Sequence, residues 1–303
     1  MTQGLTRRSF LTYCTASAAV LGLGPFDLFK IRTALANPAA PKVVWIQGAG
    51  CSGCSISFLN LVSAAAPINA AAVLTDTIDL IFHPTLMWAS GEQASGIVTK
   101  TINEDNYVLI VEGGAPTAFD GGACLPWSVN GVEVTFQQAV VSAAARATKV
   151  ICVGTCACFG GMSAAGENPG GVKPISTAIG EPTINISGCP PHPDAIVWAI
   201  AQLLAGNPID LDGDGRPKAI YGKTVHNECP RNRTKTGKDW ANAVGVDNLC
   251  LELLGCRGPD TSAPCPTWQW NDKANWCVDA NGNCIGCTEK TFPGPYKFHR
   301  TIS

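Results

Sequence analysis

The sequence predicts a doubly wound α/β domain followed by an irregular, cysteine-rich region. Short apolar runs rich in Val and Ile recur along the first two thirds of the chain, and longer stretches compatible with helices separate them, as in buried parallel sheets. From Gly206 onward the chain is rich in Gly, Pro, Asn, Cys and Trp and shows little periodicity. A region so poor in regular pattern needs cross-links or cofactors to hold it together.

The N-terminus resembles a twin-arginine export signal. Arg7 and Arg8 precede an apolar run at residues 16–26, and the sequence ALA at 34–36 offers a small-residue cleavage site. The alternative is a short buried helix, although these three features rarely coincide by chance. We therefore expect residues 1–36 to be removed and the mature chain to be periplasmic.

Composition excludes two classes of partner. The chain has 303 residues, of which 46% are hydrophobic and 15% charged, which is ample for a packed core. Removal of residues 1–36 takes away four basic residues and one acidic residue, so the formal charge falls from −2 to −5 and leaves no basic footprint for nucleic acid. The best later apolar run, at 195–205, has the length of a core helix, so we expect no membrane span in the mature chain.

Five predicted strands alternate with predicted helices. The strands are residues 42–47, 78–82, 107–112, 149–154 and 183–187. Stretches that can be helical include residues 55–66, 135–148 and 194–205. This alternation predicts a doubly wound domain over residues 37–205, and residues 206–303 form the second, irregular domain.

Four cysteines follow the ends of predicted strands. Cys51 and Cys54 follow the first strand, Cys156 the fourth and Cys189 the fifth; we call them the strand-end quartet. Ligands bind at this edge of an open parallel sheet, so residues distant in sequence can converge there. Four thiolates suit an iron-sulfur cluster or zinc, and neighbouring glycines let backbone N–H groups approach the sulfurs. Cys51 and Cys54 alone could instead be a redox dithiol.

The second region contains two further sets of four candidate ligands. His226, Cys229, Cys250 and Cys256 form the histidine quartet. Taken alone, His226 could be an ordinary polar surface residue, but it stands three residues before a cysteine in a cysteine-rich loop. An imidazole in place of a thiolate tends to raise the potential of a cluster, which fits the exit of an electron chain. Cys265, Cys277, Cys284 and Cys287 form the C-terminal quartet.

Eleven cysteines and one histidine thus allow three four-ligand clusters. Fifteen cysteines in an exported protein ordinarily indicate disulfides, but dense disulfides belong chiefly to small domains without a core. The twin-arginine route carries folded proteins, so thiols can bind metal in the cytoplasm first. Among the others, Cys14 is lost with the signal and Cys152 is interpreted as a buried apolar residue. Cys158 is a packing residue or a substitute ligand, and Cys124 is a free or structural thiol.

Successive blocks of the chain resemble a known family in the same order. They are WIQGAGCSGCS, FHPTLM, VEGGAPT, GTCACFGG, GCPPHPD, DGRP, HNECP, LGCRGP and NWCVDANGNCIGC. Over essentially its whole length the chain resembles the small, electron-transferring subunit of periplasmic nickel-iron hydrogenases. The resemblance implies a flavodoxin-like N-terminal domain with a proximal four-iron (4Fe-4S) cluster on the strand-end quartet, and a C-terminal domain with a distal cluster on the histidine quartet and a medial one on the C-terminal quartet.

The block NWCV separates branches of this family. Most standard members resemble NWPV and have a three-iron medial cluster, whereas Cys277 here should supply a fourth thiolate, as in the nickel-iron-selenium branch. Ile56 strengthens that likeness because standard members usually have glutamate there. Gly53 stands where oxygen-tolerant, membrane-bound members have an extra cysteine. The residue that binds nickel, cysteine or selenocysteine, lies on the other subunit.

The resemblance also implies partners. A large subunit would hold the nickel-iron centre that splits hydrogen, in a tight heterodimer, and electrons would pass to an acceptor such as the multihaem cytochrome c3. We expect an apolar face that includes His83, Glu112 and Trp88 to meet the large subunit. Two rival classes are a secreted disulfide-rich binding protein and a freestanding iron-sulfur electron carrier.

Two other motifs resemble a calcium loop and a nucleotide-binding loop, but each lacks a feature that such a loop requires. Asp210, Asp212 and Asp214 resemble the start of a calcium loop, but Tyr221 stands where the loop needs glutamate. We expect a turn before a strand there instead. The sequence GAGCSG lacks the G-x-G-x-x-G spacing of a nucleotide loop.

Overall fold

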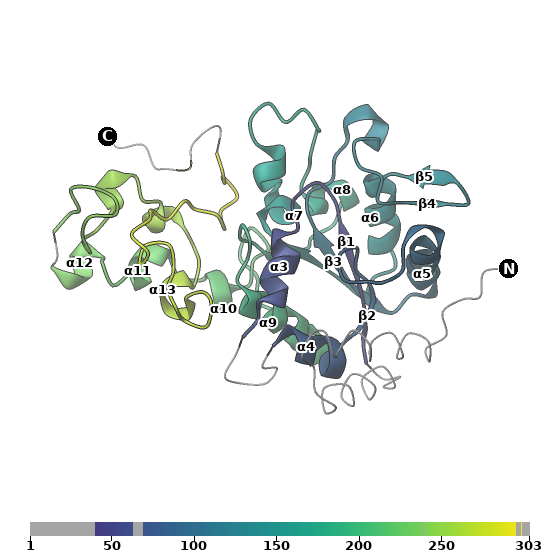
Figure 1. Cartoon of the computed structure of the whole chain (residues 1–303), viewed down its shortest axis with the longest axis horizontal. Coiled ribbons are helices and arrows are strands. Elements are labelled where there is room, and N and C mark those ends of the chain that lie inside the picture. Colours follow the sequence, from purple (N-terminus) through teal and green to yellow (C-terminus); the bar gives the residue numbers. More distant parts are fainter. Residues whose placement is uncertain (1–39, 63–68, 238, 295–297, 299–303) are drawn as a thin grey trace.

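The computed structural model describes residues 40–62, 69–237, 239–294 and 298, and its centre is a parallel sheet (Figure 1). The strands are β1 (Lys42–Gln47), β2 (Asp79–Phe82), β3 (Tyr107–Glu112), β6 (Lys149–Val153) and β7 (Ile184–Ile186). They lie in the order β2-β1-β3-β6-β7. Counted among themselves this is 2-1-3-4-5, the flavodoxin-like order. The predicted fold class and its five strands are confirmed, whereas the predicted signal lies outside the described residues.

Helices cover both faces of the sheet. α3 (Gly53–Leu59), α4 (Ala70–Ala72) and α9 (Pro193–Leu204) pack on the face that includes Val43 and Trp45. The opposite face, with Val44 and Ile46, is covered by a second set. This set comprises α5 (Gly91–Glu104), α6 (Phe136–Ala144), α7 (Thr155–Phe159) and α8 (Ile175–Ile179). Alternate residues of β1 therefore serve two separate cores, which is why the strand is apolar throughout.

α5 and a two-stranded hairpin lie where no element is predicted, and α3 ends earlier than the helix predicted over residues 55–66. The hairpin consists of β4 (Trp127–Val129) and β5 (Val132–Val134). Glu92, in the first turn of α5, accepts the N–H groups of Asn130 and Gly131 at 3.3 and 3.2 Å, so the two missed elements hold each other. Shorter elements fill the connections: the π-helical turn Val73–Thr77 and the 3-10 turns Ala118–Gly121 and Gly161–Ala164.

The region after Gly206 is irregular, as predicted, and is built from short helical segments. They are α10 (Lys218–Tyr221), α11 (Val225–Glu228), α12 (Arg233–Thr236), α13 (Cys265–Trp268) and the 3-10 turns η4 (Glu252–Leu254) and η5 (Gly258–Asp260). A separate small core of Val225, Leu251, Ala263, Trp276 and Val278 holds these segments together with several cysteines. No helix in the described part of the chain is long and apolar enough to span a bilayer.

The calcium-like sequence forms a turn that is closed by its own arginine. The carboxylate of Asp212 accepts the N–H groups of Asp214 and Arg216 at 2.9 and 2.8 Å and the Nε of Arg216 at 2.9 Å. The turn is confirmed, but the strand expected after it is wrong, because α10 follows instead. Because Arg216 already binds the Asp212 carboxylate, this carboxylate is not available as a calcium ligand.

Candidate metal centres

The strand-end quartet converges at the carboxyl edge of the sheet. Cys54 lies at the start of α3, and Cys156 at the start of α7. Burial raises the pKa of the Cys54 thiol, and the charges of Glu112 and of the three other quartet members raise it further. Burial also raises the pKa of Cys189 to about 11, with added repulsion from Cys156 and Cys51. These mutual effects place the four sulfurs in one site, as the strand-end positions predict.

Two glycines lie against sulfur atoms of this quartet. Gly154 has a φ of +90°, and a Cβ built on it would lie 2.4 Å from the Sγ of Cys54. Only glycine fits this strand end, because both the conformation and the contact exclude a side chain. The N–H of Gly53 points at the Sγ of Cys51 over 3.4 Å, the kind of donor that stabilises a thiolate.

Glu112 binds the backbone at Cys54 and so supports the strand-end quartet. Its carboxylate accepts the N–H groups of Cys54 and Ser55 at 3.1 and 3.3 Å, the Ser55 hydroxyl at 2.5 Å and the Trp45 indole N–H at 3.1 Å. The expectation that Glu112 and His83 form a surface toward a partner is wrong, because both are 1% exposed. Trp88, 72% exposed, is the only one of the three at the surface.

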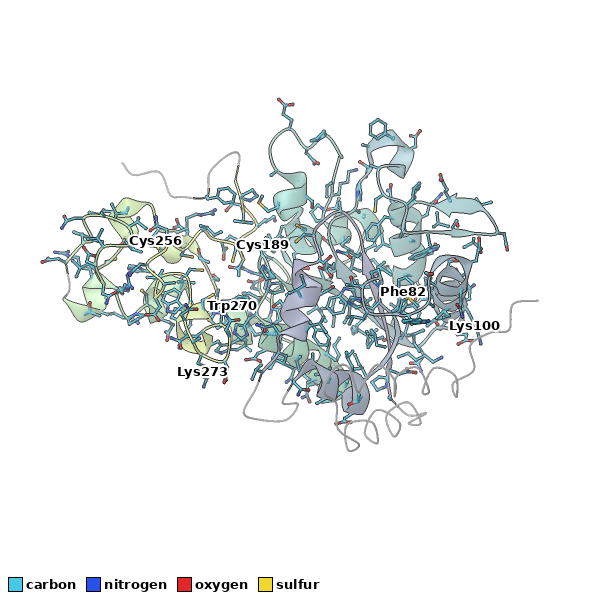
Figure 2. The ribbon with its side chains drawn as sticks, in the orientation of Figure 1. Phe82, Lys100, Cys189, Cys256, Trp270 and Lys273 are labelled. Atoms are coloured by element: carbon cyan, nitrogen blue, oxygen red, sulfur yellow. The ribbon has the colours of Figure 1, made fainter. Side chains whose placement is uncertain are left out.

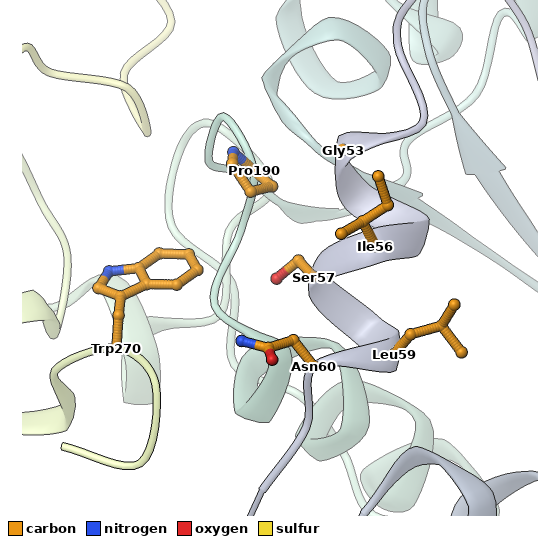
Figure 3. A pocket seen from close by; sticks show the side chains of 7 residues that line it. All are labelled: Gly53, Ile56, Ser57, Leu59, Asn60, Pro190 and Trp270. Atoms are coloured by element: carbon orange, nitrogen blue, oxygen red, sulfur yellow. The ribbon is translucent and has the colours of Figure 1, made fainter. Parts of the chain in front are cut away.

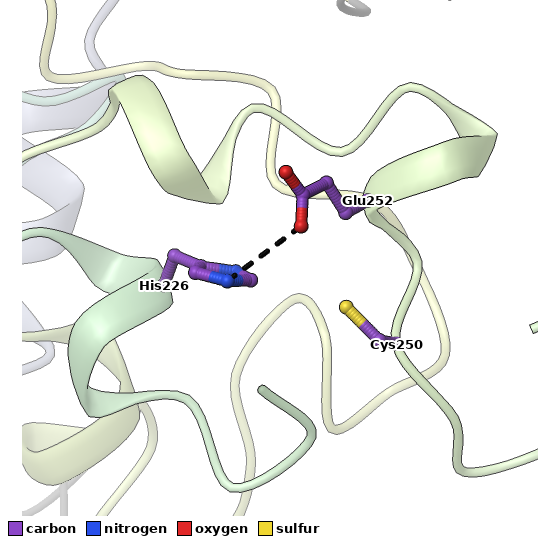
Figure 4. A group of neighbouring side chains, drawn as sticks. All are labelled: His226, Cys250 and Glu252. Atoms are coloured by element: carbon purple, nitrogen blue, oxygen red, sulfur yellow. Dashed lines mark ion pairs between the residues drawn. The ribbon is translucent and has the colours of Figure 1, made fainter. Parts of the chain in front are cut away.

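The histidine quartet lies at α11 and around η4. Burial raises the pKa of Cys229, and Cys256 and Cys250 add repulsion. The N–H of Arg231 lies 3.4 Å from the Sγ of Cys229. His226 and Cys250 face one another, with ligand atoms within 4.8 Å (Figure 4). Glu252 completes this group, and the sequence analysis missed it because a lone carboxylate two residues after a cysteine carries no spacing signal.

The C-terminal quartet also forms one cluster of thiols. Burial raises the pKa of Cys265 to about 12, and Cys284 and Cys277 add repulsion. The pKa of Cys287 is raised well above its usual range by burial and by repulsion from its three companions. Cys277 is exposed, whereas Cys284 is buried. All four predicted members are therefore neighbours, including the cysteine that the block NWCV adds.

The C-terminal quartet lies between the other two. On one side, the hydroxyl of Thr155, the residue before Cys156, donates to the carbonyl of Cys287 at 2.5 Å. On the other side, the N–H of Cys284 lies 3.4 Å from the Sγ of Cys256. Figure 2 shows Cys189 beside the sheet domain and Cys256 in the cysteine-rich region. The three quartets therefore form a row: strand-end, C-terminal, histidine.

His192 and Thr155 join the sheet domain to the cysteine-rich region. The His192 ring lies between Trp268 and Trp270, with centroids 5.3 and 4.9 Å away, and its Nε2 contacts the carbonyl of Gln269 at 2.5 Å. The Thr155 hydroxyl donates to the carbonyl of Cys287 at 2.5 Å and accepts the Gly188 N–H at 2.9 Å. Sequence reasoning missed both residues, since neither is a ligand type in a ligand pattern.

An open groove of about 480 Å³ runs along this junction (Figure 3). It is lined by Gly53, Ile56, Ser57, Leu59, Asn60, Pro190 and Trp270. In Figure 3, Ser57 and Asn60 point from α3 toward Trp270, whereas Ile56 and Leu59 point away from it. Ile56 and Leu59 are 62% and 43% exposed, so this side of α3 presents apolar surface beside the strand-end quartet.

Three other described cysteines belong to no quartet, although Cys158 lies close enough to Cys54 and Cys156 that their charges, after burial, raise its pKa. Cys152 and Cys158 are buried, and the Cys158 thiol contacts the carbonyl of Cys152 at 3.5 Å. Burial raises the pKa of Cys152 to about 12, which keeps its thiol protonated. Cys124 is partly buried and packs against the α5–α6 core. The cysteines of the described residues are all free thiols.

The chemistry of the three donor sets fits a metal group. Thiols crowded together with raised pKa values are unfavourable as bare thiolates, because burial and mutual repulsion both oppose their charge. A bound metal reverses this balance, since the cation deprotonates a coordinating thiol outright. Backbone N–H groups aimed at sulfur favour the same charged form. Each quartet therefore suits iron-sulfur ligation.

Comparison with known proteins agrees with this chemistry. Residues 221–299 match the model for the C-terminal domain of the NiFe/NiFeSe hydrogenase small subunit, and residues 51–203 match that for the 20 kDa subunit of NADH ubiquinone oxidoreductase. The periplasmic NiFe hydrogenase small subunit of Solidesulfovibrio fructosivorans is 37% identical over 95% of this chain and 90% of its own length. The chain belongs to the NiFe/NiFeSe hydrogenase small-subunit family. This is an oxidoreductase family.

Other relatives of this hydrogenase small subunit include both branches. The periplasmic NiFeSe hydrogenase small subunit of Desulfomicrobium baculatum is 36% identical over 95% of this chain and 96% of that protein. Among solved structures, the NiFeSe hydrogenase of Desulfovibrio vulgaris Hildenborough superposes with a TM-score of 0.80 at 34% identity, covering 88% of this chain and 99% of that one. That of Dm. baculatum gives a TM-score of 0.78 at 35% identity, covering 86% and 99%.

Proposed function

We propose that this protein relays electrons between the nickel-iron centre of a large partner subunit, where hydrogen is split, and an external acceptor such as the multihaem cytochrome c3. The observation that carries the proposal is the row of three donor sets, because Cys287 of the C-terminal quartet accepts a hydrogen bond from Thr155, next to Cys156, and the N–H of Cys284 lies 3.4 Å from the Sγ of Cys256. Four-iron clusters bound there would supply one-electron redox centres.

Each quartet would have one place in that path. The strand-end quartet would hold the proximal cluster, the C-terminal quartet the medial cluster and the histidine quartet the distal cluster. The proximal end is supported by the apolar side of α3, where Ile56 and Leu59 are exposed beside Cys51 and Cys189. A large subunit seated there would cover these two exposed thiols and shield the site from water.

The domain division and the export route are part of the proposal. Residues 37–205 would form the flavodoxin-like domain with the proximal site, and residues 206–303 the domain with the medial and distal sites. The paired arginines and the cleavage-site sequence support export through the twin-arginine pathway to the periplasm. The relatives named above are periplasmic enzymes, which agrees with this route.

The test is to determine the metals and the subunits of the native complex. We expect a heterodimer with hydrogenase activity, nickel in the large subunit and four iron atoms for each quartet of this chain. Zinc in place of iron would refute the cluster assignment. A brown monomer without hydrogenase activity would favour a freestanding electron carrier, and colourless protein with few free thiols would favour a disulfide-rich binding protein.

A further inference from the structure

Glu252 lies against the histidine of the histidine quartet. Its Oε2 is 3.6 Å from the Nε2 of His226, and the Sγ of Cys250 points into the space beside them (Figure 4). The ligand atoms of these three residues all lie within 4.8 Å of one another. The side chains of His226 and Glu252 are only 18% and 27% exposed, so their interaction is partly shielded from solvent.

The backbone fixes both partners. His226 lies in α11, whose N-cap Thr224 accepts the Asn227 N–H at 3.2 Å, and the His226 carbonyl accepts the Asn232 amide at 2.8 Å. Glu252 opens the turn η4, two residues after Cys250. The approach of carboxylate to imidazole is therefore set by the local fold on both sides.

The ring nitrogen that faces Glu252 decides what the carboxylate can do. Because Nε2 faces Glu252, Nδ1 is the nitrogen left for a metal. A metal-bound imidazole commonly donates its other N–H to a carboxylate, which fixes the orientation of the ring and makes the bound nitrogen a stronger donor. A stronger donor and a nearby negative charge both stabilise the oxidised state of a metal centre.

We propose that Glu252 is a positioning residue that orients the His226 imidazole through Nε2 and lowers the reduction potential of the cluster on the histidine quartet. This inference rests on the proposed function, because it needs a cluster at that site. Its effect opposes the higher potential that an imidazole ligand brings. The carboxylate would thus keep the reduction potential of the distal cluster close to those of the medial and proximal clusters.

The test is a potentiometric titration of the distal cluster in the purified heterodimer, followed by electron paramagnetic resonance. Glu252→Gln removes the charge and keeps the size of the side chain. We expect the ratio of reduced to oxidised cluster at a fixed potential to rise on the order of tenfold, which is about 59 mV for a one-electron centre. The nitrogen hyperfine coupling of the imidazole should change in the same variant.

Glu228→Gln is the matched control. Glu228 lies on the same helix as His226 and is 28% exposed, almost the same as Glu252, but it pairs with Lys223 at 3.4 Å. Removal of this charge should leave the nitrogen coupling unchanged and shift the ratio far less. An equal shift in both variants would overturn the inference, because general surface charge would then explain it.

A double-mutant cycle separates action through the ring from action through space. In a His226→Cys background the imidazole is absent and only the through-space effect of the charge remains, so Glu252→Gln should shift the potential clearly less than in the wild type. A shift of the same size in both backgrounds would overturn the positioning role. A wild-type distal centre without any nitrogen coupling would instead refute the ligand assignment in the proposed function, and iron analysis of each variant detects a lost cluster.

Discussion

His83 is a buried histidine whose ring is uncharged. Its Nδ1 accepts the N–H groups of Thr85 and Leu86 at 3.1 and 3.3 Å, so Nε2 carries the hydrogen and donates to the Ser55 hydroxyl at 3.2 Å. That hydroxyl donates in turn to Glu112. Burial lowers the pKa of His83 to about 4 from an ordinary value of 6.5. The uncharged ring is therefore part of the support beneath the strand-end quartet.

This depressed pKa predicts a loss of stability in acid. Between pH 6.5 and about pH 4 the unfolded chain binds a proton at His83 and the folded chain does not, so falling pH favours unfolding. From pH 7 to pH 5 we expect a loss of about 2 kcal/mol from this group. Urea unfolding of the wild type and of His83→Gln at both pH values checks it. An equal loss in the two proteins would contradict the prediction.

We expect Cys277 to set the iron count of the C-terminal quartet. Replacement of Cys277 by proline should remove one ligand and leave a three-iron cluster. The expected result is one iron fewer per chain and a three-iron signal in the oxidised protein. Cys124→Ala is the control, because Cys124 lies outside the quartets and its loss should leave the iron count unchanged. An unchanged iron count in Cys277→Pro would contradict the assignment.

At the scale of elements, the ends of the parallel strands create the first site. The sequence predicted this edge correctly because apolar runs locate buried strands, and parallel strands bring their carboxyl ends together. It could not locate the support beneath the site. Glu112 is the last residue of β3, and only the register of β3 beside β1 reveals that its carboxylate lies under Cys54.

Gly154 allows a direct test of this strand end. Gly154→Ala should abolish the strand-end cluster, because the new Cβ would lie 2.4 Å from the Cys54 sulfur. Gly180→Ala is the matched control, since Gly180 also has a positive φ, +74°, but has no atom within 4 Å of a built Cβ. Gly180→Ala should lose about 1 kcal/mol from strain in the left-handed region, and Gly154→Ala should lose more, because its φ of +90° and ψ of 149° lie in a region that essentially only glycine adopts. Iron should fall by four atoms only in Gly154→Ala, and equal iron in both would contradict the prediction.

At the scale of the whole molecule, the buried Arg216 links the segment around Glu289 to the turn at Asp212. Arg216, 7% exposed at its side chain, pairs with Asp212 at 2.9 Å and with Glu289 at 3.0 Å. Glu289 also accepts the N–H of Ser262 at 2.7 Å. The loop that carries Cys284 and Cys287 is thereby tied to the turn after the sheet domain.

Loss of this arginine should destabilise the chain strongly. Arg216→Met leaves two partly buried carboxylates without their cation, which should cost about 3 kcal/mol. Lys218→Met is the control, because Lys218 and Asp210 pair at 3.0 Å with 54% and 77% exposure and should contribute less than about 1 kcal/mol. Urea midpoints of the two variants check the difference, and similar midpoints would contradict it.

Much of the irregular region could not have been predicted in three dimensions. Cysteine spacing predicted its candidate ligands, because ligand types cluster in sequence. The order of the quartets in space depends on contacts such as that of Cys284 with Cys256, and His192 meets the rings of Trp268 and Trp270 and the carbonyl of Gln269, which is 77 positions away in sequence. Such long-range packing leaves no periodic trace in a region of short turns.

Thr155 gives this arrangement a consequence for biosynthesis. Its hydroxyl binds the backbone at Gly188 and at Cys287, so the loops of two neighbouring quartets share one anchor. The strand-end quartet therefore gains this anchor only after residue 287 has left the ribosome. We expect iron to enter only after translation ends, and ribosome-stalled chains that stop before residue 287 should hold none at the strand-end quartet.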